Sequence, residues 1–543
     1  MKKQLSIAGL LTATAIALAG CAAPASGSGE DGSTGGRLGY VEAQAWNTLY
    51  PPSAGFYPNG AVVNQVTDRL LYQNPDTLEL EPWIAAELPE VNDDATEYTF
   101  TIREGVTYSD GTPLDAENVV RNIELFAKGD TDRGLAPSEA IANFESGEVV
   151  DEHTVKFTFS EPAPGFPQGL STINSGLLAN ATLERTGDEF GPGNATEIIG
   201  SGPFVVTGEE LNSSLAFDAR DDYDWAPPSL EHQGRADIDG IDLTVAEESS
   251  VRVGTVIAGQ ADIARQIPVP DEAQFAGDGF EIVAAPTNGV NNSLNFRFGH
   301  PLLSDIRVRE AIIAGVDREE IVNTLFSDSY PVATGILAKT ALGYLDTSED
   351  YVYDPAQAEA LLDEAGWVPG ADGIREKDGE KLVLTFNEAL PLQRSREVIT
   401  LIQEQLAVIG IGVELFPGDQ AAQNAARDDI NEIQVYHQLV GRADYEVLKS
   451  QFFSTNRNVL LNYDPESEQL RDEQLDALLA EIASGATDDE RQAASEAAQE
   501  YLAANAYVLP LFEEPLVYGL RASVEGFATE AVGRPTFYSV SLN

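Results

Sequence analysis

The sequence predicts an α/β protein with two or three lobes that works outside the cytoplasm. Three observations support this: a hydrophobic leader, strand and helix patterns that alternate along the chain, and a length of 543 residues. A hydrophobic fraction of 43%, with no second long apolar run, is typical of a soluble globular protein. Because one hydrophobic core stops growing at about 250–300 residues, this length predicts several lobes.

The first element is an export signal over residues 1–20. Lys2 and Lys3 precede an apolar stretch that is too short to remain as a membrane-spanning helix. Cys21, the only cysteine, follows Leu-Ala-Gly, so no intrachain disulfide can form. LAGC resembles the lipobox of bacterial lipoproteins, which implies that Cys21 becomes a lipidated N-terminus on the outer side of the cell membrane. The alternative is an ordinary secretion signal with an incidental cysteine.

The next segment, residues 21–36, is rich in Ala, Gly and Ser, and we expect a flexible tether there. The formal net charge of the whole chain is −57, and removal of the two leader lysines makes it −59. Such a surface repels nucleic acid, so no nucleic-acid partner is expected.

Residues 98–126 predict a strand, a turn and a helix. Apolar residues alternate with polar ones from Tyr98 to Arg103, and the same alternation returns at residues 155–159. Asp110-Gly111 predicts a turn, and Asp115 stands at the N-cap of a helix whose apolar face includes Phe126. Nothing in this segment is chemically reactive, so we expect a structural role.

Three later segments are equally clear. Residues 198–206, IIGSGPFVV, predict a tight entry into a strand. Residues 305–325 predict two helices, the second capped by Asp317 with Glu320 at the capping-box position. Residues 354–366 predict a helix with Asp354 as cap, Pro355 at its first position and Gly366 as its end.

In this order, the segments resemble the dipeptide/oligopeptide/nickel-type extracellular solute-binding proteins, family 5, of ABC importers. The resemblance is carried by YSDGTPLDAENVV, NFRFGHPLLSDIRVREAIIAGVDREEIV and YDPAQAEALLDEAGW. Residues 47–51, NTLYP, are similar to the family's early Thr-Leu-Asp-Pro, with Tyr50 in place of the aspartate. The resemblance implies a monomeric binding protein that captures a peptide or peptide-like solute and hands it to a permease with its ATPase.

The resemblance also implies a fold, the type II periplasmic-binding-protein class of cluster C. Two lobes joined by a hinge would clamp the solute, and a third lobe would be added to them. Lobe I would combine residues 37–55, 197–292 and 506–543; the extra lobe II would span 56–196 and lobe III 293–505. The chain would cross between the clamping lobes near residues 292 and 505.

Peptide-binding relatives hold the ligand's amino group with an aspartate in an Asp-Tyr segment, three residues after a tryptophan. Here Asp444 and Tyr445 match that pair, while Gly441 takes the place of the tryptophan, which predicts an enlarged or reshaped pocket. Arg442 adds a charge that would favour an anionic group. Three aromatic residues near the start of lobe I are further ligand-binding candidates: Trp46, Tyr50 and Tyr57.

We expect no catalytic residues, cofactor or metal. The chain has no nucleophile elbow, zinc-protease motif or phosphate loop. The four histidines, His153, His232, His300 and His437, are far apart, and the Asp237-x-Asp239-Gly240 stretch places its glycine too early for an EF-hand. A hydrolase with a catalytic carboxylate pair, such as a glycosidase, and a surface adhesin are the alternatives. The sequence leaves the identity of the solute open.

Overall fold

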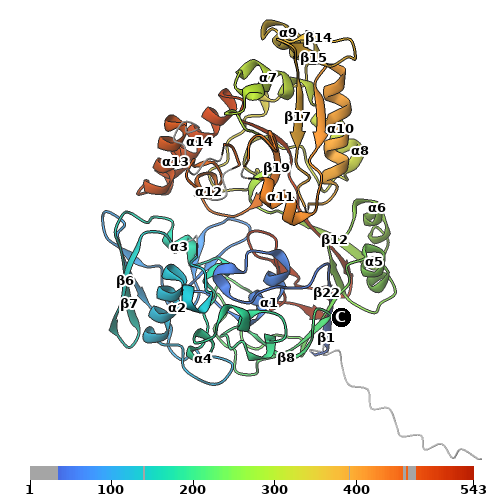
Figure 1. Cartoon of the computed structure of the whole chain (residues 1–543). Coiled ribbons are helices and arrows are strands. Elements are labelled where there is room, and N and C mark those ends of the chain that lie inside the picture. The colour runs from blue at the N-terminus through green and yellow to red at the C-terminus, as the bar shows by residue number, and fades with distance from the viewer. Residues whose placement is uncertain (1–34, 139–140, 391, 428, 457–459, 463–471) are drawn as a thin grey trace, which may run out of the picture. The chain divides into compact units, whose positions relative to one another are not determined.

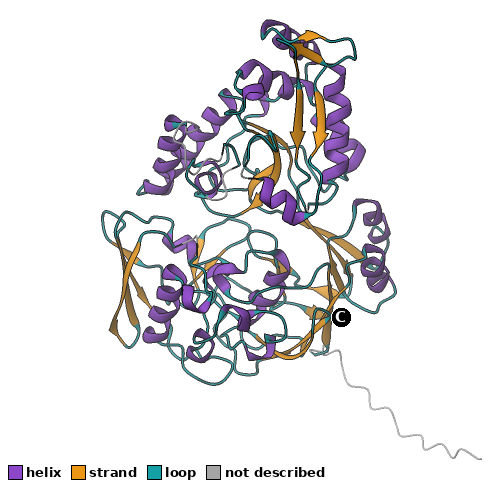
Figure 2. Ribbon diagram, in the orientation of Figure 1, coloured by secondary structure: helices purple, strands orange, loops and turns teal. Residues whose placement is uncertain are grey.

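The computed structural model describes residues 35–543 except 139–140, 391, 428, 457–459 and 463–471. Cys21 and the leader lie outside the described residues. Strands are spread through the described chain, with helices between them (Figure 2). Within this part, none of the helices combines the length and the apolar character needed to cross a bilayer.

The largest sheet has seven strands and gathers segments from both ends of the chain. Their order across the sheet is β12 (Phe280–Ala285), β21 (Leu516–Arg521), β11 (Ile263–Arg265), β1 (Arg37–Glu42), β10 (Gly240–Val245), β9 (Ser214–Ala219) and β8 (Phe204–Glu210). Strand β1 is parallel to both of its neighbours, and the other pairs are antiparallel.

The second large sheet has five strands and lies within the C-terminal half. Its order is β18 (Gly412–Leu415), β17 (Val383–Phe386), β19 (Val435–Gly441), β13 (Gly289–Phe296) and β20 (Val508–Phe512). Helix α10 (Ser395–Val408) lies along this sheet (Figure 1). Four other helices in this part of the chain are α7 (Ile306–Gly315), α8 (Arg318–Leu325), α9 (Pro355–Glu364) and α11 (Gln420–Ala426).

A four-stranded antiparallel sheet lies in the segment assigned to the extra lobe. Its order is β4 (Glu90–Val91), β5 (Glu97–Thr101), β7 (Thr154–Phe159) and β6 (Phe144–Asp151), and α2 (Ala116–Lys128) packs against it. Its buried aromatic rings belong to the same continuous core as the seven-stranded sheet. The extra segment therefore shares a core with the first lobe.

Short elements complete the described chain. The small sheets pair β2 (Leu71–Gln73) with β3 (Leu80–Pro82), β22 (Val524–Glu525) with β25 (Ser541–Leu542), β23 (Ala528–Thr529) with β24 (Pro535–Thr536), and β14 (Val368–Pro369), β15 (Arg375–Lys377) and β16 (Glu380–Lys381). The remaining helices are α1 (Tyr57–Val66), α3 (Phe166–Gly169), α4 (Asn180–Leu183), α5 (Ser249–Ile257), α6 (Val269–Glu272), α12 (Val447–Phe452), α13 (Glu473–Ser484) and α14 (Asp488–Ala504).

Strands β13 and β20 both belong to the five-stranded sheet. The predicted crossing at residue 292 therefore falls inside β13, and the predicted crossing at residue 505 precedes β20. The connections between the two large sheets are residues 286–288 and 513–515, between β12 and β13 and between β20 and β21. We therefore propose lobe boundaries at these two connections. The expected boundaries differ because backbone pairing across the sheet leaves no signal in a single strand's sequence.

The predicted helix starts are confirmed. Asp115 accepts a hydrogen bond from the Asn118 amide at 2.9 Å, and Asp354 caps α9 through the Gln357 amide at 3.0 Å. Asp317 likewise caps α8, but no reciprocal bond from Glu320 closes a capping box. The amide of Gln405, on α10, takes that role: its oxygen accepts from the Asp317 N–H at 3.1 Å.

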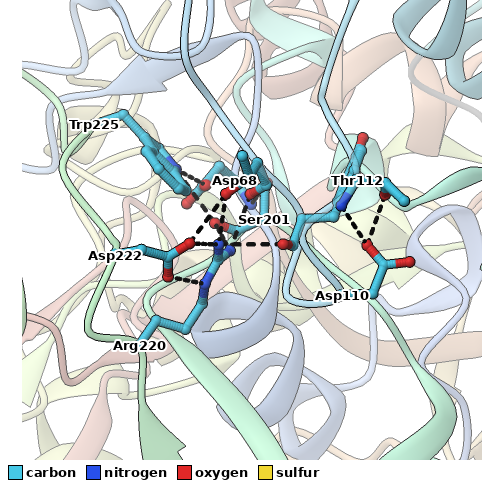
Figure 3. Close-up of polar contacts among 9 residues, drawn as sticks. Asp68, Asp110, Thr112, Ser201, Arg220, Asp222 and Trp225 are labelled. Atoms are coloured by element: carbon cyan, nitrogen blue, oxygen red, sulfur yellow. Dashed lines mark hydrogen bonds and ion pairs between the residues drawn. The ribbon is translucent and has the colours of Figure 1, made fainter.

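Arg220, which follows β9, holds the signature segment in place (Figure 3). Its guanidinium donates to the carbonyl oxygens of Thr107 at 3.0 Å and Ser201 at 3.1 Å. It also forms an ion pair with Asp222 at 2.9 Å and lies 5.1 Å from the ring of Trp225. One arginine thus ties the YSDGTP turn and the Gly-Ser-Gly-Pro entry to the large sheet, in agreement with the structural role predicted for both.

Candidate functional site

A cavity of about 500 Å³ is the candidate site. Three parts of the chain line it: the loops 52–55 and 530–534, the segments 69–73 and 165–174, and the loop 441–446 that leaves β19. These parts come from the seven-stranded sheet region, the extra segment and the five-stranded sheet region, respectively. Residues far apart in sequence therefore meet around one space.

Asp444 and Arg442 both line this cavity and form an ion pair with each other. The second carboxylate oxygen of Asp444 accepts a hydrogen bond from the Glu446 amide at 2.9 Å. The Asp444 side chain is 11% exposed and that of Arg442 is 23% exposed. The carboxylate of Asp444 is thus already engaged on both oxygens, so a ligand amine has to share it with Arg442.

The backbone of Ala443 fixes the loop between these two residues. Its carbonyl oxygen accepts hydrogen bonds from the side-chain amides of Gln73 at 2.9 Å and Gln168 at 3.0 Å. The Ala443 side chain also packs with Leu78 and Ala531 in a small apolar cluster. The loop that carries Asp444 is therefore held by the extra segment and by the C-terminal region together.

Gly441 is where the sequence predicts a reshaped pocket, and the structure shows what occupies the space. A Cβ atom added at Gly441 would lie 2.4 Å from the hydroxyl oxygen of Tyr57 and 3.2 Å from the Thr287 carbonyl oxygen. Tyr57 is held from its other side by Arg534, whose guanidinium carbon lies 4.9 Å from the ring centre. The phenol of Tyr57 thus fills the place of the side chain that Gly441 lacks.

A second cavity of about 300 Å³ borders Gly441, Tyr57 and Arg534 on the side of the two crossings between the sheets. Its apolar lining comes from both sheet regions: Phe56, Leu390, Leu392, Leu439, Leu516 and Val517. Glu514 is its carboxylate, and desolvation raises the pKa of Glu514 to about 7. The two cavities therefore share a wall and differ in polarity.

A chain of hydrogen bonds runs from Glu514 to the start of α10. Asn292 donates to Glu514 at 2.9 Å, so its amide oxygen accepts the hydrogen bond that it shares with Nε2 of His437 at 2.5 Å. Nδ1 of His437 then accepts from the hydroxyl of Ser395 at 2.9 Å. Burial lowers the pKa of His437 to about 3, so the ring is neutral and structural.

Two arginines of the first cavity were not predicted from the sequence. Arg69 is 4% exposed and Arg534 is 6% exposed, yet both line the cavity. The Asp68-Arg69 pair interrupts an otherwise uncharged run over residues 57–75, which is the one signal that could have drawn attention to Arg69. Arg534 has no comparable signal.

The remaining predicted ligand-binding residues lie away from both cavities. Tyr50 packs against Phe190 with ring centres 5.1 Å apart, and Trp46 is 5% exposed in the same core. Tyr445 is not part of the lining, and the Arg491 guanidinium carbon lies 4.9 Å from its ring centre. Large apolar rings favour burial wherever a core is available, which explains the positions of Trp46 and Tyr50.

The described residues contain no group of three or more His, Cys, Asp or Glu side chains placed to hold a metal ion. The Asp237–Asp242 stretch is engaged in protein contacts: Asp239 accepts from the Gly36 amide at 2.9 Å and pairs with Arg235 at 3.2 Å. The acidic stretch serves the fold at this position.

Comparisons with known proteins agree with this architecture. Residues 79–455 match the model of the bacterial extracellular solute-binding proteins, family 5. Protein XP55 of Streptomyces lividans is 30% identical over 367 residues, which cover 67% of this chain and 64% of XP55. The glutathione-binding protein GsiB of Salmonella typhimurium is 26% identical over 374 residues, 68% of each chain.

Solved structures share the fold. The substrate-binding protein CtaP of an ABC transporter, from Listeria monocytogenes, superposes with a TM-score of 0.78 at 22% identity, covering 94% of this chain and 99% of CtaP. The predicted type II periplasmic-binding-protein fold is therefore confirmed. The family consists of binding proteins that act outside the cytoplasm and are not enzymes. This chain belongs to the bacterial extracellular solute-binding proteins, family 5.

Proposed function

We propose that the protein captures a peptide or peptide-like solute in the 500 Å³ cavity and delivers it to an ABC permease and its ATPase. The observation that carries the proposal is that three chain regions enclose this cavity, with ion-paired charges in its wall. Family membership and the glutathione-binding relative support a small peptide-like ligand. Relatives with other solutes show that the fold alone does not choose the ligand.

The ligand contacts that we propose centre on Asp444 and Arg442. A zwitterionic solute could place its amino group on Asp444 and a carboxylate near Arg442, so that the existing ion pair is exchanged for two pairs with the ligand. Tyr57, which lines the adjoining 300 Å³ cavity, would back the wall at Gly441. Trp46, Tyr50 and Tyr445 are buried outside the cavity lining, so we propose no contact between them and the solute.

Capture requires that the two clamping lobes move about the connections 286–288 and 513–515. A ligand shifts such a hinge equilibrium only if it binds the closed form better than the open form. Contacts of the Ala443 loop with Gln73 and Gln168 supply the closed form with hydrogen bonds that opening would break. We expect small-angle scattering to show compaction when the solute binds.

The test is binding of glutathione and of short peptides, followed by analysis of the recovered compound. We expect at least one of them to raise the melting temperature and to be recovered chemically unchanged. A product in the recovered fraction would favour the hydrolase alternative instead. Failure of every small solute to bind would leave the adhesin alternative and would end the proposal of capture.

We further propose that the protein is a monomer anchored through lipid at Cys21. The support is the LAGC sequence at the end of the leader. Two acyl chains anchor a protein stably, whereas one chain binds a membrane only marginally. Full-length protein expressed in a bacterial host should fractionate with membranes, and Cys21→Ser should move it to the soluble extracytoplasmic fraction. Sedimentation of the released protein should give the mass of one chain.

A further inference from the structure

The lining of the 500 Å³ cavity contains three arginines and three carboxylates, in a protein whose net charge is −57. Each carboxylate of the lining has an arginine partner. The pairs are Asp444 with Arg442, Glu530 with Arg534 and Glu446 with Arg491. Arg69 is the additional lining arginine. Arg491, the partner of Glu446, lies outside the lining, so among the described residues Arg69 is the lining arginine that is left without a carboxylate partner.

Arg69 is buried without a carboxylate partner among the described residues. One of its terminal nitrogens donates to the side-chain oxygen of Asn64, and its guanidinium carbon lies 5.6 Å from the ring centre of Trp83. Its Nε atom has no hydrogen-bond partner in the described structure. The side chain is 4% exposed, so water cannot readily replace the missing partner.

Arg534 also lines the cavity, and it contains a buried donor without a partner among the described residues. It pairs with Glu530 at 2.8 Å and donates to the Gly55 carbonyl oxygen at 2.6 Å, but its Nε atom has no partner within the described chain. Its position depends on Gly60 in α1, where an added Cβ would lie 2.2 Å from the Arg534 Cδ atom. Because Gly60 has no side chain, Arg534 has room to pass α1 and reach the cavity wall.

Burying an unpaired guanidinium is costly, and so is an unsatisfied buried donor. Burial accordingly lowers the pKa of Arg69, although Glu530 and Asp68 oppose this effect. Neither carboxylate satisfies Arg69, because Glu530 pairs with Arg534 and Asp68 bonds to Trp225 at 2.8 Å. A group that binds here from outside would relieve the cost.

We infer that the solute carries a carboxylate and that Arg69 and Arg534 bind it. This inference rests on the proposed capture of a solute in the cavity. Guanidinium groups bind carboxylates through charge-assisted hydrogen bonds, and both arginines line the cavity where such an acceptor would bind. The class of solute is therefore an organic acid such as a peptide with a free C-terminus, and neutral or purely cationic compounds are disfavoured.

The test compares each probe as the free acid and as its amide, by titration calorimetry. The probes are glutathione and a set of di- and tripeptides with matched C-terminal amides. We expect the free acid to bind about 10- to 100-fold more tightly than the amide, the range for hydrogen bonds to a charged group. Arg69→Gln should reduce this preference, and Arg69→Lys should restore part of it.

Arg309→Gln is the matched control. Arg309 is also 4% exposed, but it bonds to the Leu303 carbonyl oxygen at 2.6 Å and lies outside the cavity lining. We expect this variant to keep the acid preference, and melting temperatures without ligand report whether each variant folds. Equal binding of acid and amide overturns the inference while solute capture stands. If neither form of any probe binds, capture of peptide-like solutes fails as well.

Discussion

Asp68 should make the protein more stable in mild acid than at neutral pH. Its side chain is fully buried, and burial raises its pKa from 3.8 to about 6 despite hydrogen bonds from Trp225 at 2.8 Å and Tyr223 at 3.2 Å. Folding therefore favours the protonated form. The contribution is fully present below pH 3.8, and it is lost as the pH rises to about 6.

The size of this effect follows from the pKa shift. One pKa unit corresponds to about 1.4 kcal/mol, so the shift of Asp68 amounts to about 3 kcal/mol. Asp68→Asn keeps an oxygen that accepts from Trp225 and removes the ionisable group. The difference in unfolding free energy between variant and wild type should change by about 3 kcal/mol, in favour of the variant, between pH 4 and pH 7.

The assay is urea unfolding of both proteins at several pH values. Taking the difference cancels the titration of all other carboxylates. Asp222→Asn is a control from the same cluster (Figure 3), because the ion pair with Arg220 lowers the pKa of Asp222 and the pH trend should reverse. A difference between wild type and Asp68→Asn that stays constant from pH 4 to pH 7 would refute the reasoning.

Three further variants test other parts of the structure. Gly200→Ala would place a Cβ 1.8 Å from the last carbonyl oxygen of α1, so urea unfolding should show that the free energy of unfolding falls by at least about 1–3 kcal/mol. Gly254→Ala is the control: the space around Gly254 is open, so this variant should be neutral or stabilising. Gly441→Ala should push the Tyr57 hydroxyl away and weaken solute binding about tenfold in calorimetry, with little change in the melting temperature; unchanged affinity would argue against Tyr57 as a cavity wall. Because burial raises the pKa of Glu514 from 4.5 to about 7, wild-type stability should fall as the pH rises through that range. Glu514→Gln should therefore show a smaller fall in melting temperature than the wild type between pH 5 and pH 8, since Asp68 still titrates in both proteins.

Local elements follow from the sequence because their causes lie within a few residues. The aspartate at the start of α2 bonds to an amide three positions later, and the same spacing holds for α9. The alternation from Tyr98 to Arg103 places Tyr98 and Phe100 in the core, both no more than 1% exposed. Such features depend on backbone periodicity and on hydrogen bonds between near neighbours.

The sequence predicts only part of the candidate site. Asp444 and Arg442 do line the cavity, but their mutual ion pair changes what they offer to a ligand. Trp46 and Tyr50 lie in the core instead of the cavity wall. An aromatic side chain has the same sequence signal in a core and in a ligand site, and only the surrounding atoms distinguish the two.

By itself, the sequence determined the helix caps, the strand alternation and the ordered segments that resemble family 5. Only the tertiary structure decided that Tyr57 fills the space beside Gly441 and that Arg69 and Arg534 reach one cavity. The physical reason is distance along the chain. Gly60 must lack a side chain so that Arg534 can cross α1, and contacts between residues so far apart leave no periodic trace in either segment.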